Sequence, residues 1–304
     1  MPLCRRACLG PTARGAVSQW KGAGSMADIR VVTDSGADIP KDLAQELGIR
    51  VVPLTIHFGD EERRDGVDLT PEEFFRRLRS GQLSRTTQPS PADFEKVYRA
   101  LAEEGADAII SCHLSAEMSG TVQSATLASQ MVDVPVHVVD TRSASMGIGM
   151  VAIEAARLAR QGAGVDDILA RLRGIIAQQR VLFMVDTLEY LQRNGRIGKA
   201  QAFLGGLLNV KPLLTIDDGV VAPLERARGH AKAVSRIVER MVELAGDKPQ
   251  RVAVVHGDAP AEAASLAEQI RARVQVAEMF IAMLGPTIGT HAGPGTLGVV
   301  FYPA

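Results

Sequence analysis

The sequence predicts a two-domain α/β protein, with an N-terminal doubly wound parallel sheet and a C-terminal α/β domain built on a mixed sheet. Two observations carry this prediction. Between residues 29 and 141, short β-branched runs alternate with amphipathic helical stretches, which is typical of parallel strands joined by helices. After residue 180 a second set of strands follows, and residues 217–219 (Asp-Asp-Gly) form a hairpin turn that makes two of those strands antiparallel.

The N-terminal domain is expected to alternate strands and helices in order. Asp38, Pro40 and Gly48 frame its first helix as N-cap, first-turn proline and terminating glycine. Thr70 opens a capping-box pattern and Ser90 precedes a proline, so each is expected to begin a helix. A further helix is expected over 120–131. The strands are expected over 29–35, 50–58 (with a proline inside it that suggests an edge or a bulge), 107–114 and 134–141.

The C-terminal domain is expected to begin near a Gly-Ala-Gly stretch at 162–164, so that the two domains cover 26–163 and 164–304. The chain reads as mostly helical from 141 to 179. The strands that follow are expected over 181–186, 211–216, 220–227, 251–257, 276–284 and 297–302.

Composition argues against two classes of function. A formal charge of −1 and only 4% aromatic residues disfavour nucleic-acid binding. No apolar run approaches the roughly 20 residues that span a bilayer, so no transmembrane segment is expected. Cys112 is the only cysteine after residue 25, so the fold does not depend on a disulfide and a reduced, cytoplasmic setting is expected. No metal site or cofactor is expected.

Residues 1–25 differ from the rest of the chain. They contain basic residues but no acidic ones, together with the only tryptophan. We interpret them as a disordered tail or as a mis-assigned start, with the natural start at Met26. Cys4 and Cys8 lie in this segment without a histidine partner, which makes a poor metal site.

Four polar clusters stand at or near the ends of predicted strands. They are 33–35 (Thr-Asp-Ser), 85–90 (RTTQPS), 113–126 (HLSAEMSGTVQSAT) and 140–141 (Asp-Thr). Because ligands of open α/β sheets bind at the carboxyl ends of the strands, these clusters are expected to converge on one cleft. The alternative for Asp34, Ser35 and Thr141 taken singly is that each caps the next helix, and we favour it.

The hydroxyl-rich stretch 113–126 raises the question of a nucleophile. It lacks the G-x-S-x-G pattern of a nucleophile elbow, and no triad order is visible along the chain. Ser119, Gly120 and Thr121 instead begin a helix, where free backbone N–H groups and short hydroxyls form an anion cradle. The glycine would let a ligand approach the backbone closely. We therefore expect this stretch to hold a ligand rather than to attack it.

Two glycine-rich segments complete the candidate sites. Residues 190–200 (YLQRNGRIGKA) group Arg193, Arg196 and Lys199 around a turn, which indicates either a phosphate site or a junction between helices. Residues 289–296 (GTHAGPGT) expose His291 in a glycine-rich loop, either as a hydrogen-bonding residue or as a ligand contact. Neither segment is a Walker loop.

Together these segments resemble the DegV family over residues 29–301. The resemblance implies a non-enzymatic two-domain protein that holds one long-chain fatty acid, such as palmitate, between its domains. It also implies a partner, because some members present the bound carboxylate to a fatty acid kinase, whose acyl phosphate product enters phospholipid synthesis. The motifs that carry the resemblance are VTDSGADIP (32–40), TTQPSP (86–91), LSAEMSGTVQSA (114–125), VVDTRSASMGIG (138–149), YLQRNGRI (190–197), KPLLTIDDG (211–219) and HAGPG (291–295).

The resemblance also implies roles for individual residues. The family's carboxylate-binding threonine and serine fall on Thr86, which opens TTQPS, and on Ser119, which precedes Gly-Thr. Its HTGPG histidine and GGRI arginine fall on His291 and Arg196, one of which is expected to supply positive charge near the carboxylate. Asn194 replaces the first glycine of GGRI and is expected to tolerate a left-handed turn. The residues expected to support the head group are Thr87, Gly120, Thr121, His291 and Arg196.

Two other functions stay open. An acyl hydrolase would use Ser119 with His291, and a phosphate or nucleotide binder would centre on residues 193–199. The lining of an acyl tunnel is expected from 146–150, 203–208 or 280–284, although ordinary core packing explains each of these apolar segments as well.

Overall fold

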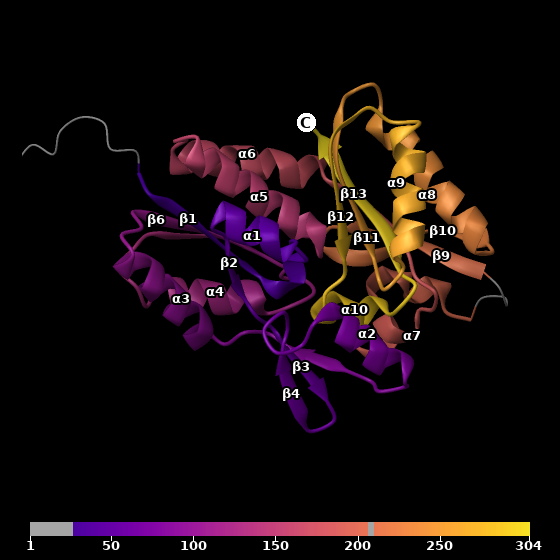
Figure 1. The fold of residues 1–304 in the computed structure, drawn as a ribbon, viewed down its shortest axis with the longest axis horizontal. Coiled ribbons are helices and arrows are strands. Elements are labelled where there is room, and N and C mark those ends of the chain that lie inside the picture. Colours follow the sequence, from indigo (N-terminus) through magenta and orange to yellow (C-terminus); the bar gives the residue numbers. More distant parts are fainter. Residues whose placement is uncertain (1–26, 206–209) are drawn as a thin grey trace, which may run out of the picture.

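A computed structural model describes residues 27–205 and 210–304 (Figure 1). The expectations for the segment 1–25, for a start at Met26 and for tunnel lining at 206–208 lie outside the described residues. No described helix is both long and apolar enough to cross a membrane. Cys112 is free and fully buried, and burial raises the pKa of its thiol to about 12. The cytoplasmic location stays a prediction.

The N-terminal part contains the expected parallel sheet. Its strands are β2 (Arg50–Val52), β1 (Ile29–Asp34), β6 (Ala108–His113) and β7 (Val136–Asp140), in that spatial order and all parallel. Successive residues of β1 point to opposite faces, with Val32 toward α3 (Pro91–Glu103) and α4 (Thr121–Ser129), and Val31 toward α5 (Met146–Arg160). Helices on both faces make the sheet doubly wound, as predicted (Figure 1).

The strand expected over 50–58 divides at Pro53. Its second half becomes β3 (Thr55–Phe58), which pairs with β4 (Glu61–Arg64) and β5 (Arg85–Thr87) in a separate antiparallel sheet. Because a proline has no N–H to donate to the hydrogen bonds of a sheet, the chain leaves the parallel sheet at this residue. This small sheet places Thr86 close to α10 (Pro286–Ala292).

Of the three helix starts predicted from capping residues, two are confirmed. Thr70 accepts a hydrogen bond from the N–H of Glu73 at the start of α2 (Pro71–Arg79), and Ser90 forms a capping box at the start of α3. The third is wrong, because Pro40 occupies the N-cap of α1 (Lys41–Leu47). Asp38 instead adopts a left-handed conformation and accepts hydrogen bonds from Ser145 Oγ and the N–H of Gly285.

The C-terminal part contains the mixed sheet. Its six strands run in the spatial order β10-β9-β8-β13-β11-β12, and only β11 and β12 are parallel. The hairpin turn predicted at 217–219 joins β9 and β10. The strand bounds are β8 (Arg180–Met184), β9 (Val210–Asp217), β10 (Val220–Arg228), β11 (Gln250–His256), β12 (Val276–Met283) and β13 (Leu297–Pro303).

The two faces of the mixed sheet pack against different partners. Helices α8 (His230–Ala245) and α9 (Pro260–Arg271) cover one face and share a closed core with it. The opposite face packs against α5 and α6 (Val165–Gln178). Helix α5 therefore lies between the parallel sheet and the mixed sheet. The short elements η1 (Ser35–Ala37), α7 (Glu189–Arg193), η2 (Gly198–Phe203) and α10 complete the fold, and α10 lies beside α2 and α7 at the junction (Figure 1). The domain division at 163/164 stays a prediction.

Candidate functional site

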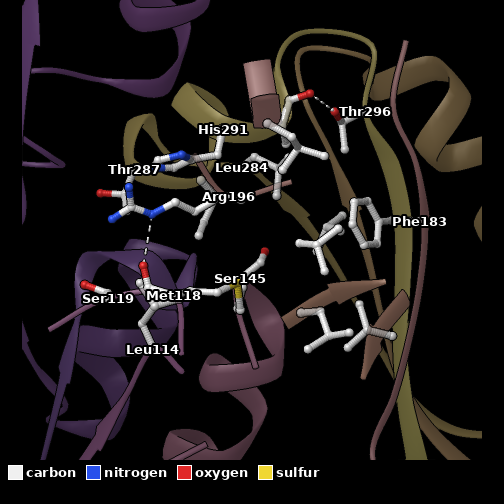
Figure 2. Close-up of a pocket in the computed structure, with 18 of the residues that line it drawn as sticks. Leu114, Met118, Ser119, Ser145, Phe183, Arg196, Leu284, Thr287, His291 and Thr296 are labelled. Atoms are coloured by element: carbon white, nitrogen blue, oxygen red, sulfur yellow. Dashed lines mark hydrogen bonds between the residues drawn. The ribbon is translucent and has the colours of Figure 1, made fainter. Parts of the chain in front are cut away.

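A pocket lies between the inner face of the mixed sheet and the loops that follow β2, β6 and β7 (Figure 2). The space between its walls, counting the part open to solvent, is about 860 Å³. The lining is mostly aliphatic. Its polar members are Thr86, Ser119, Ser145, Arg196, Thr287, His291 and Thr296.

Two of the four predicted polar clusters meet at this pocket. Thr86 comes from β5 and Ser119 from the loop after β6, and both line it. The other two clusters do not contribute. Thr33 and Thr141 are buried, and each donates its hydroxyl to a backbone carbonyl of β6. Fewer polar clusters therefore reach the pocket than the four that were predicted. Hydroxyls at strand ends can instead form hydrogen bonds with the backbone of a neighbouring strand.

His291 is the partner of Thr86. Its Nε2 and Thr86 Oγ1 lie 3.0 Å apart and share a hydrogen bond. His291 stands in the last turn of α10 and not in an open loop, so the expectation of a bare glycine-rich segment is wrong. Gly285, Pro286 and Gly293 frame that helix in the sequence, with the proline in the first turn and a glycine after the end. This frame of proline and glycines predicts a short helix at 286–292.

The protonation state of His291 follows from its surroundings. Burial, and secondarily the charge of Arg196, lower the pKa of the His291 ring to about 4. The imidazole is therefore neutral at pH 7, so of the two residues expected to supply positive charge, Arg196 or His291, His291 does not. Its Nδ1 is buried and has no hydrogen-bond partner among the described residues. The positive charge at this end of the pocket comes from Arg196.

The backbone around Ser119 is less open than a free anion cradle. Ser119 Oγ lies 2.8 Å from Thr121 Oγ1, and the N–H of Gly120 donates to Gln88 Oε1 over 3.0 Å. A Cβ at position 120 would lie 2.4 Å from the Gln88 amide. Gly120 therefore makes room for Gln88, and of the predicted trio 119–121 only Ser119 lines the pocket.

Thr87 does not reach the pocket. Successive residues of a strand point to opposite sides, so Thr87 points away from the side of β5 that carries Thr86. Its Oγ1 lies 2.8 Å from Nε2 of His57 on the neighbouring strand β3. The expected supporting role of Thr87 at the head group therefore has no geometric basis.

The three basic residues of 193–199 do not form a cluster. Arg193 pairs with Glu189 at 2.9 Å, and Lys199 pairs with Asp217 at 2.7 Å. Arg196 is exposed, lines the pocket and donates to the carbonyls of Met118 and Asn194. Within 27–205 and 210–304 no carboxylate lies in salt-bridge range of it.

The turn before Arg196 also differs from the expectation. Asn194 has a φ of −92°, and Gly195 takes the left-handed conformation with a φ of 70°. The Asn194 side chain is used instead for a contact between elements, since its Nδ2 donates to the carbonyl of Thr290 over 2.9 Å. Asn194 thereby ties the end of α7 to the helix that carries His291.

A Ser–His pair suited to hydrolysis is absent from the described pocket residues. Ser119 bonds to Thr121, His291 bonds to Thr86, and no carboxylate orients the His291 Nδ1. A nucleophilic serine needs both contacts. The pocket geometry therefore gives no support to the hydrolase reading.

A serine–histidine–aspartate chain does occur elsewhere, inside the parallel sheet. Ser111 Oγ lies 2.6 Å from His113 Nε2, and His113 Nδ1 lies 2.9 Å from Asp34 Oδ2. Tyr98 continues the chain through its hydroxyl, 2.8 Å from Ser111 Oγ. All four side chains are completely buried, so no substrate reaches them. This chain satisfies polar groups inside the core.

Most of the apolar lining was not identified from the sequence. Of the three segments considered, only Leu284 lines the pocket, whereas residues 146–150 are buried core of α5, and Phe203 and Leu204 lie elsewhere. Thr287 and Ile288 line the pocket at four and three residues before His291. Helical spacing from His291 would have found both.

Comparisons with known proteins agree with this architecture. A family model described as "Uncharacterised protein, DegV family" matches residues 28–304. A DegV domain-containing protein of Streptomyces coelicolor is 41% identical over 273 residues, which is 90% of this chain and 97% of that protein. The structure of a fatty-acid-binding DegV family protein from Thermus thermophilus matches with a TM-score of 0.87 and 42% identity, covering 91% of this chain and all of that one. The structure of DegV from Bacillus subtilis, a fatty acid binding protein, matches with a TM-score of 0.83 and 38% identity, over 91% and 100% of the two chains.

Proposed function

The chain belongs to the DegV family, and on that premise we propose that it binds one long-chain fatty acid, such as palmitate, and presents the carboxylate to a fatty acid kinase. The observation that carries the proposal is the pocket itself. An aliphatic cavity ends at a small group of polar side chains, and a fatty acid has the same division between hydrocarbon and head group. The relatives of known structure that bind fatty acids support the ligand class.

The hydrocarbon tail supplies most of the affinity. Burying about 16 carbons at roughly 0.8 kcal/mol each yields on the order of 12 kcal/mol before the costs of association. A hydrogen bond to the carboxylate adds about 1.5–3 kcal/mol. The polar end therefore sets the orientation and register of the ligand more than its affinity.

Thr86 and Ser119 hold the carboxylate in this proposal. Both residues line the pocket, and a hydroxyl can donate one hydrogen bond to a carboxylate oxygen. While Thr86 donates to the ligand, its oxygen still accepts from the neutral His291 ring. His291 thus orients the Thr86 hydroxyl without adding a charge.

Arg196 offsets the cost of placing an anion at the entrance. It is the basic residue of the 193–199 segment that has no carboxylate partner in the described structure, and it lines the pocket while remaining exposed. An exposed guanidinium beside the bound carboxylate can also contact an incoming phosphate group. We therefore assign Arg196 to the phosphorylation step, which yields the acyl phosphate for phospholipid synthesis.

The test is a trapping experiment with the loaded protein. Delipidated protein is loaded with palmitate, mixed with a fatty acid kinase and ATP, and the acyl phosphate is captured with hydroxylamine as an acyl hydroxamate. The proposal predicts kinase-dependent hydroxamate from the wild-type chain and much less from Ser119→Ala at equal protein concentration. Palmitate uptake without any hydroxamate would restrict the function to binding, and failure of uptake would refute the proposal as a whole.

A further inference from the structure

The end of the pocket opposite the head-group residues has its own composition. In Figure 2, Phe183 and Thr296 stand on one side of the pocket, and Ser119, Met118 and Arg196 stand on the other. Thr296 donates its hydroxyl to the carbonyl oxygens of Ala292 and Gly293 at the end of α10, so the hydroxyl is already paired. The neighbouring lining from the sheet is aliphatic, and this end therefore suits hydrocarbon alone. The aliphatic lining from the sheet consists of Val181, Ile216, Val221, Val255 and Val300.

Phe183 is the aromatic ring in this lining. Alternate residues of β8 point to opposite faces of the sheet, so Val181 and Phe183 face the pocket while Leu182 and Met184 enter the core beneath α8 and α9. Phe183 remains only partly buried although β8 is an interior strand with a neighbour on each side. Its exposed part therefore faces the cavity.

The backbone that carries Phe183 is held at a fixed depth. The residue pairs with Gly298 of β13 on one side and with Leu214 of β9 on the other. A Cβ at position 298 would lie 2.9 Å from the Phe183 Cβ and 3.1 Å from Val255 Cγ2. Gly298 thus leaves space for the base of the Phe183 side chain. The pairing of β8 with β13 and β9 holds the backbone of Phe183 in place.

We propose that the Phe183 ring is the stop that the methyl end of the acyl chain meets, and that it sets the longest chain the pocket accepts. The inference rests on the proposed fatty-acid binding and adds chain-length selection to it. Each methylene excluded from the pocket forfeits its burial, which amounts to about fourfold in affinity per carbon. A smaller side chain at position 183 should recover that factor for each carbon that enters the vacated space.

The experiment is a competition among chain lengths. Delipidated protein is offered an equimolar mixture of saturated fatty acids of about 12 to about 20 carbons, and the retained ligands are extracted and quantified by mass spectrometry. Phe183→Leu opens the end of the pocket and Phe183→Trp fills it further. Phe280→Leu is the matched control, because Phe280 is a partly buried residue of β12 in the same sheet but does not line the pocket.

We expect Phe183→Leu to shift the retained ligands toward longer chains and Phe183→Trp toward shorter ones, while Phe280→Leu keeps the wild-type distribution. The inference is overturned if both Phe183 variants, folded as judged by thermal melting, retain the wild-type distribution, or if the control shifts in the same way. Failure of the wild-type chain to retain any of these fatty acids would instead overturn the proposed function, and this inference with it.

Discussion

The Thr86→Val substitution tests the head-group site with a minimal change of shape. Valine keeps the β-branched side chain that suits strand β5 and removes only the hydroxyl. In the structure Thr86 lines the pocket, and its hydroxyl lies 3.0 Å from His291 Nε2. The variant therefore loses the donor to the carboxylate and leaves the ring nitrogen of His291 without its partner.

The expected magnitude follows from the value of one charge-assisted hydrogen bond. A loss of about 1.5–3 kcal/mol corresponds to an increase in Kd of about tenfold to 150-fold. The tail contribution is untouched, so binding should weaken without disappearing. Calorimetric titration of delipidated protein with palmitate at neutral pH measures the change.

Thr87→Val is the matched control. It makes the same chemical change one residue away, on the opposite side of β5, where the Thr87 hydroxyl contacts His57 and not the pocket. We expect its Kd to remain within about twofold of wild type. Equal effects of the two substitutions, or no effect of Thr86→Val, would refute the assignment of Thr86 to the carboxylate.

Three further changes test other parts of the structure. Gly289→Ala would place a Cβ 2.6 Å from the Phe74 ring and should lower the free energy of unfolding by about 1–3 kcal/mol in chemical denaturation. The control Gly174→Ala, inside α6 with no described atom beyond the local helix backbone within 4 Å of the new Cβ, should raise it by about 0.5–1 kcal/mol, and equal destabilisation would contradict the packing argument. Arg196→Gln should raise the pKa of His291 from about 4 but leave it below 6.5, because burial is the larger cause; an NMR titration that shows no change would exclude the electrostatic contact. The same variant should reduce kinase-dependent acyl phosphate more than fatty-acid retention, and the reverse order would count against its assigned role. Because the pKa of His291 is lower in the folded chain, the unfolded chain binds more protons between about pH 4 and 6.5, and His291 makes stability rise with pH in that range. His291→Gln should therefore flatten the rise of the melting temperature with pH. An unchanged dependence of the melting temperature on pH would contradict the neutral, buried ring.

Regular patterns let the sequence predict most of the architecture. The alternation of β-branched and amphipathic segments indicated both sheets, and residues 217–219 marked the hairpin correctly because that turn type depends on local residues. The predictions that were wrong concern residues whose tertiary contacts outweigh their local preference. Asp38 looks like an N-cap in the sequence, yet it binds Ser145 and Gly285, which are far away along the chain. Such contacts leave no local pattern.

Only part of the site could be predicted, because motifs identify residues but do not show their tertiary surroundings. Thr86 and Ser119 were inferred from family motifs, and the structure places both at one pocket together with Arg196 and His291. The neutral state of His291 depends on burial and on a neighbouring charge, neither of which can be read from the residues beside it. Phe183 was also not identified, because an apolar residue on a strand looks the same whether it faces a core or a cavity.

The most direct test of the central claim is the lipid content of the protein itself. The natively purified chain, extracted and analysed by mass spectrometry, should contain close to one equivalent of long-chain fatty acid, and Thr86→Val and Ser119→Ala should contain less. Protein that carries no fatty acid and takes up none when palmitate is added would contradict the claim that this pocket binds an acyl chain.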